Sequence, residues 1–176
     1  MVSIWDAIGA VLQQEFSDVP DLEQAIRICM RLVIAAVLGG LLGFERELSG
    51  KPAGIRTHML VSMGSALFVL IPQQSGVAPT DVSRVVQGIV AGVGFLGAGT
   101  ILKDSGSVHV KGLTTAAGIW LTAAIGLAAG LGREMTAVLS TMLALGVLGL
   151  EPVFRSVSDR VRARRGLEPS PPPSQD

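Results

Sequence analysis

The stretch AIRICMRLVIAAVLGGLLGF, residues 25–44, sets the fold class. It holds twenty residues, and only Arg27 and Arg31 among them carry charge. As a helix rising 1.5 Å per residue it would span roughly 30 Å, the thickness of the hydrocarbon core of a bilayer. Four further apolar runs follow it, at residues 57–71, 85–102, 112–131 and 135–154. The sequence therefore predicts an all-α, polytopic membrane helix bundle with about five transmembrane helices.

The composition agrees with a membrane protein. Of the 176 residues, 49% are hydrophobic and only 16% are charged, whereas about a quarter of the residues in soluble domains are charged. The formal net charge is zero, so the chain has no overall field to attract nucleic acid. The partner expected from composition is the lipid bilayer, and no nucleic acid is expected.

Three parts follow from this pattern. Residues 1–20 place several apolar side chains on one helical face and Trp5 beside them, which favours an interfacial helix, with a solvated external lead-in as the alternative. Residues 21–154 form the predicted transmembrane domain. Residues 155–176 are first basic and then rich in proline, which predicts a disordered tail.

The distribution of Lys and Arg predicts the orientation in the membrane. The segments 45–56 and 103–111, together with the tail, hold ten of these residues, while the segments 1–24, 72–84 and 132–134 hold only two. Basic residues in short loops are retained on the cytoplasmic side. The N-terminus is therefore expected outside and the C-terminus in the cytoplasm.

The loop after the first span carries acids that orientation alone does not explain. Glu45 follows the span directly, and an unpaired carboxylate at hydrocarbon depth is costly. Arg46 points about 100° away from it around a helix, so Arg56, Lys103 or Lys111 is the expected partner. Pro52 and Gly54 supply turn residues for a hairpin here, which predicts a charged cluster on the cytoplasmic face.

The third apolar run contains GVGFLG, residues 92–97, which matches the dinucleotide fingerprint by letters only. No strand leads into it, and the next acid, Asp104, is too close to serve as the ribose-binding acid. Its glycines instead have spacings that allow close helix packing, so this span is the expected centre of the bundle. The predicted packing glycines are Gly88, Gly92, Gly94, Gly97 and Gly99.

Several polar residues fall inside the predicted spans: Arg27, Arg31, Gln87, Thr114 and Thr115. Arg27 stands four residues after Glu23, a spacing that favours an ion pair. Both arginines are expected to reach the external head groups, and the alternative is a water-filled external vestibule lined by Arg31. The threonine hydroxyls can bond to their own helix backbone or across to another helix.

Motifs for soluble-type catalysis are absent from the sequence: there is no GxSxG, no HExxH and no P-loop lysine. We expect no enzyme activity and no cofactor, with an intramembrane enzyme built from Glu45 and Asp104 as a remote alternative. The same two acids are the candidate metal ligands. His58 and His109 are expected to be surface residues at the cytoplasmic helix ends.

The stretches LGGLLGFERE (38–47), AGIRTHMLVSMGSALF (53–68), VAGVGFLGAGTIL (90–102) and VKGLTTAAGIWLTAAIGLAAGLG (110–132) resemble the membrane domain of the MgtC/SapB family. The resemblance implies a multi-pass protein of the bacterial inner membrane, linked to growth under magnesium limitation and to virulence. It implies a regulator of other membrane proteins rather than a proven carrier. It also directs attention to a cytoplasmic cluster made of Glu45, Arg46, Arg56, Thr57, Asp104 and Lys111. The further signature positions it assigns are Gly43, Gly54, Arg84, Gly92, Gly94, Phe95, Gly97, Gly99, Gly112, Thr115 and Trp120.

The chain departs from that family in two ways. MgtC-type members carry a soluble C-terminal domain, whereas about 22 residues follow the last predicted span here, so activity that needs that domain is not expected. An asparagine and a cysteine of the MgtC branch correspond to Thr114 and Leu121. The first hypothesis is a non-enzymatic regulator that contacts another membrane protein or a second copy of itself. A transporter or channel for Mg2+ or another small solute is the alternative.

Overall fold

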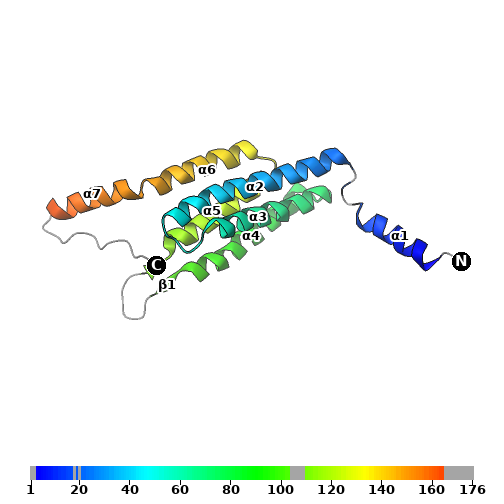
Figure 1. The fold of residues 1–176 in the computed structure, drawn as a ribbon, viewed down its shortest axis with the longest axis horizontal. Coiled ribbons are helices and arrows are strands. Elements are labelled where there is room, and N and C mark those ends of the chain that lie inside the picture. Colours follow the sequence, from blue (N-terminus) through cyan, green and yellow to red (C-terminus); the bar gives the residue numbers. More distant parts are fainter. Residues whose placement is uncertain (1–2, 18, 20, 104–109, 165–176) are drawn as a thin grey trace.

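The structure is a computed structural model and describes residues 3–17, 19, 21–103 and 110–164. Its elements in chain order are α1 (Ile4–Glu15), α2 (Leu22–Leu48), α3 (Ile55–Gln74), α4 (Pro79–Thr100), β1 (Leu102–Lys103), β2 (Val110–Lys111), α5 (Leu113–Gly130), α6 (Glu134–Gly149) and α7 (Glu151–Arg164). The helices α2 to α6 run side by side as an up-and-down bundle (Figure 1). The two short strands pair antiparallel between α4 and α5.

The predicted membrane bundle is confirmed. The five apolar runs correspond in order to α2, α3, α4, α5 and α6. Within the described residues, four helices are long and apolar enough to cross a membrane: those at Leu22–Leu48, Ile55–Gln74, Thr80–Thr100 and Leu113–Gly130. The helix α6 is apolar but has only 16 residues, so it reaches about 24 Å. The fifth predicted span is thus present as a helix that is short for a complete crossing.

Caps and glycines at the helix ends make the tight reversals possible. The carboxylate of Asp21 accepts a hydrogen bond from the backbone N–H of Gln24 at 2.7 Å and so caps the start of α2. Gly50, Gly76 and Gly132 follow α2, α3 and α5 with φ of 67°, 67° and 75°. Glycine adopts this left-handed conformation without a Cβ clash, so each helix can end within one residue and the next can turn back.

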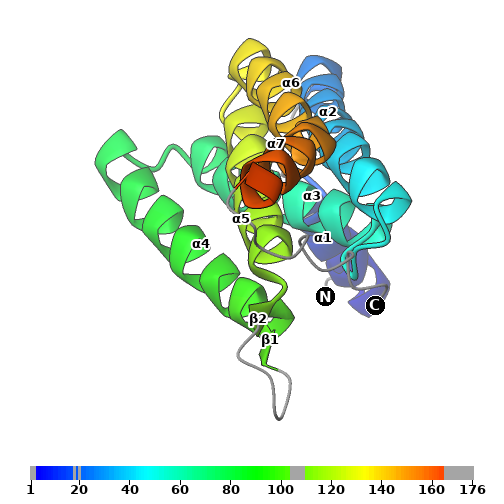
Figure 2. The same cartoon turned by 90° about the vertical axis from the view of Figure 1, so that its left-hand side faces the viewer.

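The centre of the bundle is α5. It packs against α2, α3, α4 and α6, whereas α4 packs mainly against α5 and, less extensively, against α3. Figure 2 shows α4 standing to one side of the other helices. The prediction that the third span forms the centre is therefore wrong. Alanine, threonine and glycine occur on all faces of α5, so neighbours can approach it from several directions.

Close helix packing depends on glycines in α2 and α5. A Cβ built on Gly39 would lie 2.6 Å from the carbonyl oxygen of His58, and one on Gly126 would lie 2.0 Å from that of Ser62. A Cβ on Gly130 would come within 2.5 Å of the carbonyl oxygen of Ala66. These obstructing atoms belong to the backbone of α3. Only glycine at these positions allows α2 and α5 to pack so closely on α3.

The predicted packing glycines of α4 behave differently. A Cβ on Gly88, Gly92, Gly94 or Gly99 would meet nothing within 4 Å, and only one on Gly97 would touch a neighbour, the Cβ of Ala116 at 3.5 Å. The prediction is thus wrong within this chain for four of the five glycines. Their spacing permits close packing, but the helices that would use it lie elsewhere.

The two outlying helices bear on the predicted terminal segments. The predicted N-terminal helix is present as α1, which lies beyond one end of the bundle (Figure 1), with Trp5 76% exposed. Its location at a membrane surface stays a prediction. The prediction of disorder from residue 155 onward is wrong for residues 155–164, because they belong to α7. Phe154, Val157 and Val161 have the spacing of one helical face, which the overall count of apolar residues obscured; residues 165–176 lie outside the described residues.

Candidate functional site

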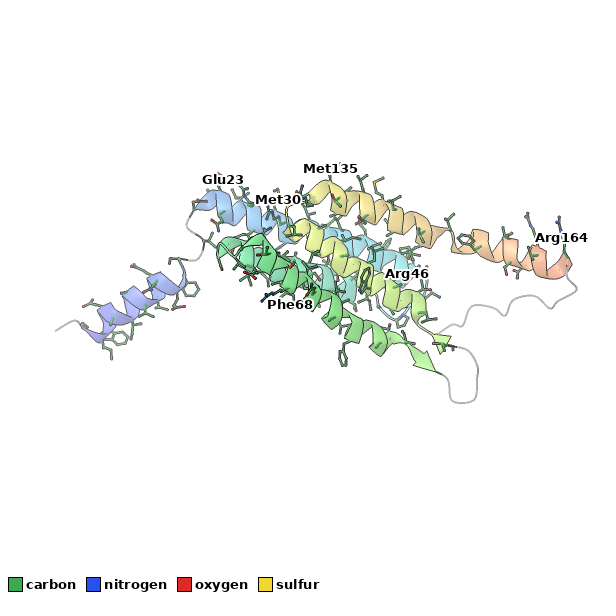
Figure 3. The ribbon with its side chains drawn as sticks, turned by 180° about the vertical axis from the view of Figure 1, so that it is seen from behind. Glu23, Met30, Arg46, Phe68, Met135 and Arg164 are labelled. Atoms are coloured by element: carbon green, nitrogen blue, oxygen red, sulfur yellow. The ribbon has the colours of Figure 1, made fainter. Side chains whose placement is uncertain are left out.

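The candidate site lies where α2 ends, α3 begins and α5 begins, which we call the Arg46 end of the bundle. Figure 3 shows Arg46 and Glu23 toward opposite ends of α2. The side chain of Arg46 is 1% exposed and that of Glu45 is 23% exposed. The Nε of Arg46 donates to Oε2 of Glu45, and Nη2 donates to Oε1 at 2.7 Å. The carboxylate also accepts a hydrogen bond from the hydroxyl of Ser49 at 2.9 Å.

This pairing corrects the predicted partner of Glu45. We expected Arg56, Lys103 or Lys111, but the carboxylate pairs with the adjacent Arg46. The Cβ atoms of neighbouring helical residues diverge by about 100°. The buried side chain of Arg46 is nevertheless long enough to place its guanidinium group against the carboxylate of Glu45. A two-point contact of this kind is among the stronger polar interactions.

Two other predicted members of the cytoplasmic cluster, Arg56 and Thr57, do not join this pair. Arg56 and Thr57 lie on the exposed face of α3. Lys111 lies in β2, beyond α4. Asp104 is outside the described residues. The structure therefore brings together Glu45 and Arg46 from the predicted set and leaves Arg56 and Thr57 on the surface.

The second acid of the loop, Glu47, caps the next helix. One of its carboxylate oxygens accepts a hydrogen bond from the backbone N–H of Ile55 at 3.1 Å. The N-cap residue of α3 is Gly54, which has no side chain to do this. A carboxylate at a helix N-terminus satisfies an unpaired donor and interacts favourably with the helix dipole. Both acids that interrupt the hydrophobic pattern thus have definite structural partners.

His58 is fully buried, which corrects its predicted surface position. Its Nδ1 lies 3.0 Å from the carbonyl oxygen of Gly54. A carbonyl only accepts, so Nδ1 carries the proton of this hydrogen bond. The sequence signal that was missed is a stripe of small side chains: Ser62, Ala66 and Val69 follow His58 at helical spacing and are buried with it.

A cavity of about 400 Å3 opens between α2, α3, α5 and α6 at this end. We call it the Arg46 cavity. Arg46, His58 and Leu42 line its buried part. Thr114 and Leu121 of α5 also line it. In the described part of the structure, Nη1 of Arg46 and Nε2 of His58 are buried and have no hydrogen-bond partner. The remaining predicted polar residues lie elsewhere, Thr115 being buried and Gln87 exposed.

A second polar group lies at the opposite end of the bundle, the Arg31 end. Nη1 of Arg31 donates to the carbonyl oxygen of Gly130 at 3.0 Å and to the side chain of Gln73 at 3.1 Å. Its Nε lies 3.7 Å from a carboxylate oxygen of Glu134. Arg31 thus connects α2 to α3, α5 and α6, although its two alternative predicted positions were at the head groups or in a vestibule.

The geometry supports the prediction of a water-filled vestibule lined by Arg31. A cavity of about 380 Å3, lined by both Arg27 and Arg31, lies at this end. The predicted pair of Arg27 with Glu23 is confirmed, with Nη2 2.5 Å from Oε1. Among the residues that the structure describes, no group of three or more His, Cys, Asp or Glu side chains has the arrangement of a metal site. Of the two candidate metal ligands, Glu45 is bound to Arg46 and Asp104 is not described.

Comparison with known proteins places the chain in a family. The model of the MgtC family matches residues 32–157, which include α3, α4, α5 and α6 and most of α2. The chain belongs to the MgtC family. No solved structure matches it.

Three named relatives align over about two thirds to three quarters of this chain. It is 47% identical to Protein SrpB of Synechococcus elongatus over 129 residues, which are 67% of this chain and 71% of SrpB. It is 43% identical over 140 residues to a protein of Escherichia coli named "Putative magnesium transporter YhiD", covering 75% of this chain and 62% of YhiD. It is 40% identical over 116 residues to Protein MgtC of Salmonella typhimurium, covering 66% of this chain and 48% of MgtC.

The resemblance found in the sequence is therefore confirmed at the level of the family. The aligned part spans about half of MgtC itself. Gly43 and Gly54, two positions that the resemblance assigns, lie close together at the Arg46 end. A Cβ on Gly43 would lie 2.6 Å from the Cα of Ile55 and 2.8 Å from the carbonyl oxygen of Gly54. This close approach of α2 to the start of α3 sets Glu45 and Arg46 beside His58.

Proposed function

We propose that this chain is a non-enzymatic, multi-pass protein of the bacterial inner membrane that binds and regulates other membrane proteins during adaptation to magnesium limitation, a role that extends to virulence. Membership of the MgtC family and the name of the relative YhiD support the link with magnesium. Ten of the twelve loop and tail basic residues lie on one side of the predicted topology, which supports an external N-terminus and a cytoplasmic C-terminus.

The observation that carries the proposal is an apolar groove between α3 and α4. It has a volume of about 670 Å3, and Gly64, Gly88 and Gly92 line it. A Cβ on any of these three glycines would meet nothing within 4 Å. The groove exists because α4 leans on α5 and leaves most of α3 uncovered on this side (Figure 2).

A transmembrane helix of another membrane protein is the occupant that we assign to this groove. In a bilayer, helices associate through close packing over small residues, because lipid chains are as apolar as leucine and supply no hydrophobic driving force. Gly88 and Gly92 are one turn apart and face the opening together with Gly64. Phe68, 61% exposed on α3, forms one wall against which a partner side chain can pack.

The test is complementation of a deletion strain grown at low Mg2+. Gly92→Ile fills the groove and is expected to abolish complementation while leaving the amount of protein in the membrane unchanged. Gly146→Ile is the matched control, because Gly146 also has nothing within 4 Å but lies on α6, outside the groove. Equal complementation by both variants would contradict the proposal.

Crosslinking gives an independent measurement. A photoreactive residue at Phe68 is expected to trap one discrete adduct in growing cells, and Gly92→Ile is expected to remove it. The same residue at Leu139 on α6, 54% exposed, is the control and should yield only lipid adducts. If the Phe68 probe captures only lipid, the groove does not receive a partner helix.

Transport of Mg2+ is the second candidate function, favoured by the cavity at the Arg31 end. Its lining includes oxygen donors of the kinds that Mg2+ prefers, namely Asp21, Glu23, Gln24, Gln73 and Gln74. Purified protein in liposomes containing a Mg2+ indicator tests it. Under the first proposal no flux is expected, and flux that disappears in Glu23→Gln, which removes a carboxylate from this cavity, would favour transport instead.

A further inference from the structure

Two side chains that line the Arg46 cavity each have a buried polar atom with no hydrogen-bond partner in the described chain. They are Nη1 of Arg46 and Nε2 of His58, in residues that are both 0% exposed. Leaving a buried donor or acceptor without a partner is costly, and more so when the group is charged. Both side chains line the same cavity. A ligand that reached these two atoms from the cavity would supply the missing hydrogen bonds.

The rest of the lining is largely apolar and extends away from these atoms. Arg46, His58 and Thr114 lie within four residues of a helix end, at the Arg46 end of the bundle. Leu121 is eight residues into α5, and Ser140 is nine residues from the end of α6. At 1.5 Å per residue the cavity therefore extends about 12–14 Å along the helices, close to the roughly 15 Å depth of one leaflet.

The cavity opens on the lateral surface of the bundle, between α5 and α6. Leu143 and Val147 at its edge are 73% and 66% exposed. Ala117 of α5 is exposed beside them. Because the helices α2 to α5 are of membrane-spanning length and composition, this surface faces lipid chains. A ligand can enter sideways from the bilayer.

We propose that the Arg46 cavity binds an anionic phospholipid whose head group carries hydroxyls. An anionic oxygen of the lipid accepts a hydrogen bond from Nη1 of Arg46, and a head-group hydroxyl donates to Nε2 of His58. One acyl chain lies along Leu121, Leu143 and Val147. The polar end of the cavity is at the helix ends and its apolar part is toward the membrane interior, which is the orientation of a lipid in that leaflet.

The charge of the site favours an anionic over a zwitterionic lipid. Glu45 neutralises Arg46 only in part at the cavity, because the side chain of Glu45 is 23% exposed and that of Arg46 is 1% exposed. Solvent screens the exposed carboxylate more effectively than the buried cation. Nη1, the nitrogen not used by Glu45, carries two N–H donors and has no hydrogen-bond partner among the described residues.

The experiment is a lipid titration of the purified, delipidated chain, read by native mass spectrometry. Dioleoyl phosphatidylglycerol is the probe, and dioleoyl phosphatidylcholine has the same chains with a zwitterionic head. We expect one phosphatidylglycerol to bind at least about tenfold more tightly, as for a hydrogen bond to a charged group. Equal affinities would overturn the proposal. Inorganic phosphate that displaces the phosphatidylglycerol would also overturn it, because the site would then hold a free anion.

Two variants locate the bound lipid. A Cβ on Gly118 would point toward Nε2 of His58 from 3.6 Å, so Gly118→Leu fills the buried end of the cavity and is expected to abolish the preference. Gly146→Leu is its control, since Gly146 faces open space outside the cavity. Persistence of the preference in Gly118→Leu would show that the lipid binds elsewhere and would overturn the proposal.

A charge variant tests whether misfolding, rather than the loss of the Arg46 charge, removes the lipid preference. The double variant Glu45→Gln, Arg46→Gln removes both charges without leaving either one buried alone. It is expected to bind the two lipids equally while keeping the thermal stability of the wild type to within a few degrees. A tenfold preference that survives in this variant would overturn the role of Arg46.

Discussion

Gly126→Ala is the substitution that most directly tests the central position of α5. A Cβ on Gly126 would lie 2.0 Å from the carbonyl oxygen of Ser62 and 2.6 Å from its carbonyl carbon. Ordinary van der Waals contact begins near 3.4 Å. The helices α3 and α5 would therefore have to separate by about 1.4 Å at this point. The obstructing atoms belong to the backbone, so no side-chain rotation can relieve the contact.

The expected cost follows from the contacts that such a separation weakens. A gap of about 0.5–1 Å already forfeits a quarter to a half of the dispersion energy of a contact. Added methyl groups in packed interiors cost about 1–3 kcal/mol, and occasionally more. We expect a loss near the upper end, about 3 kcal/mol, because Gly130 makes a similarly close approach one turn away. For a chain of this size that corresponds to a fall in Tm of about 6–12 °C.

The measurement is the thermal unfolding of the purified chain in detergent, with titration by a denaturing detergent to obtain the free energy of unfolding. Gly92→Ala is the control, because a Cβ there would meet nothing within 4 Å, and it should change the stability by less than about 0.5 kcal/mol. Wild-type stability in Gly126→Ala, or an equal loss in Gly92→Ala, would refute the assignment of α5 as the centre.

Three further predictions concern the polar groups. Glu45→Gln should reduce the free energy of unfolding by about 2 kcal/mol, because it leaves the buried cation of Arg46 with a neutral partner; the double variant Glu45→Gln, Arg46→Gln should lose less than the sum of the single losses in the same titration. Glu47→Ala should cost about 1 kcal/mol and speed amide hydrogen exchange in the first turn of α3, and unchanged exchange there would contradict its capping role. Arg31→Met should reduce the free energy of unfolding by about 2 kcal/mol, because the hydrogen bonds of Arg31 across the bundle are partly buried. Arg27→Met should reduce it by less than about 0.5 kcal/mol, because the ion pair of Arg27 is exposed. Equal losses in the two variants would contradict this difference.

The residues at the Arg46 end show how far sequence reasoning reached. It identified Glu45 as a carboxylate that needs a partner, because a charge beside a long apolar run has a definite cost. It selected the wrong partner for Glu45, because the direction that the Arg46 side chain takes depends on which face of α2 is buried. It placed His58 at the surface, because the sequence near a predicted helix end does not show whether a histidine there lies on the buried or the exposed face of the helix. Burial of that face depends on α2 and α5 packing on α3.

The glycines separate the two levels of information in the same way. Spacing alone favoured the glycines of α4, because Gly88 and Gly92 repeat at four residues. The close contacts instead use Gly39 and Gly126, which lie in other helices. A glycine spacing motif indicates that one face of a helix has only small side chains. It does not indicate whether another helix packs against that face.

The sequence by itself determined that the chain is a membrane protein of the MgtC family, with its apolar helices in the observed order. The apolar helices and their order follow from the local composition of each segment, since transfer of a segment into a bilayer depends on its own length and polarity. The family follows from the order of the sequence motifs and the family match. Only the tertiary structure decided that α5 is central, that Glu45 binds Arg46 and that His58 is buried beside a cavity. Those properties depend on which helix faces meet, and contacts between residues far apart in the chain decide that.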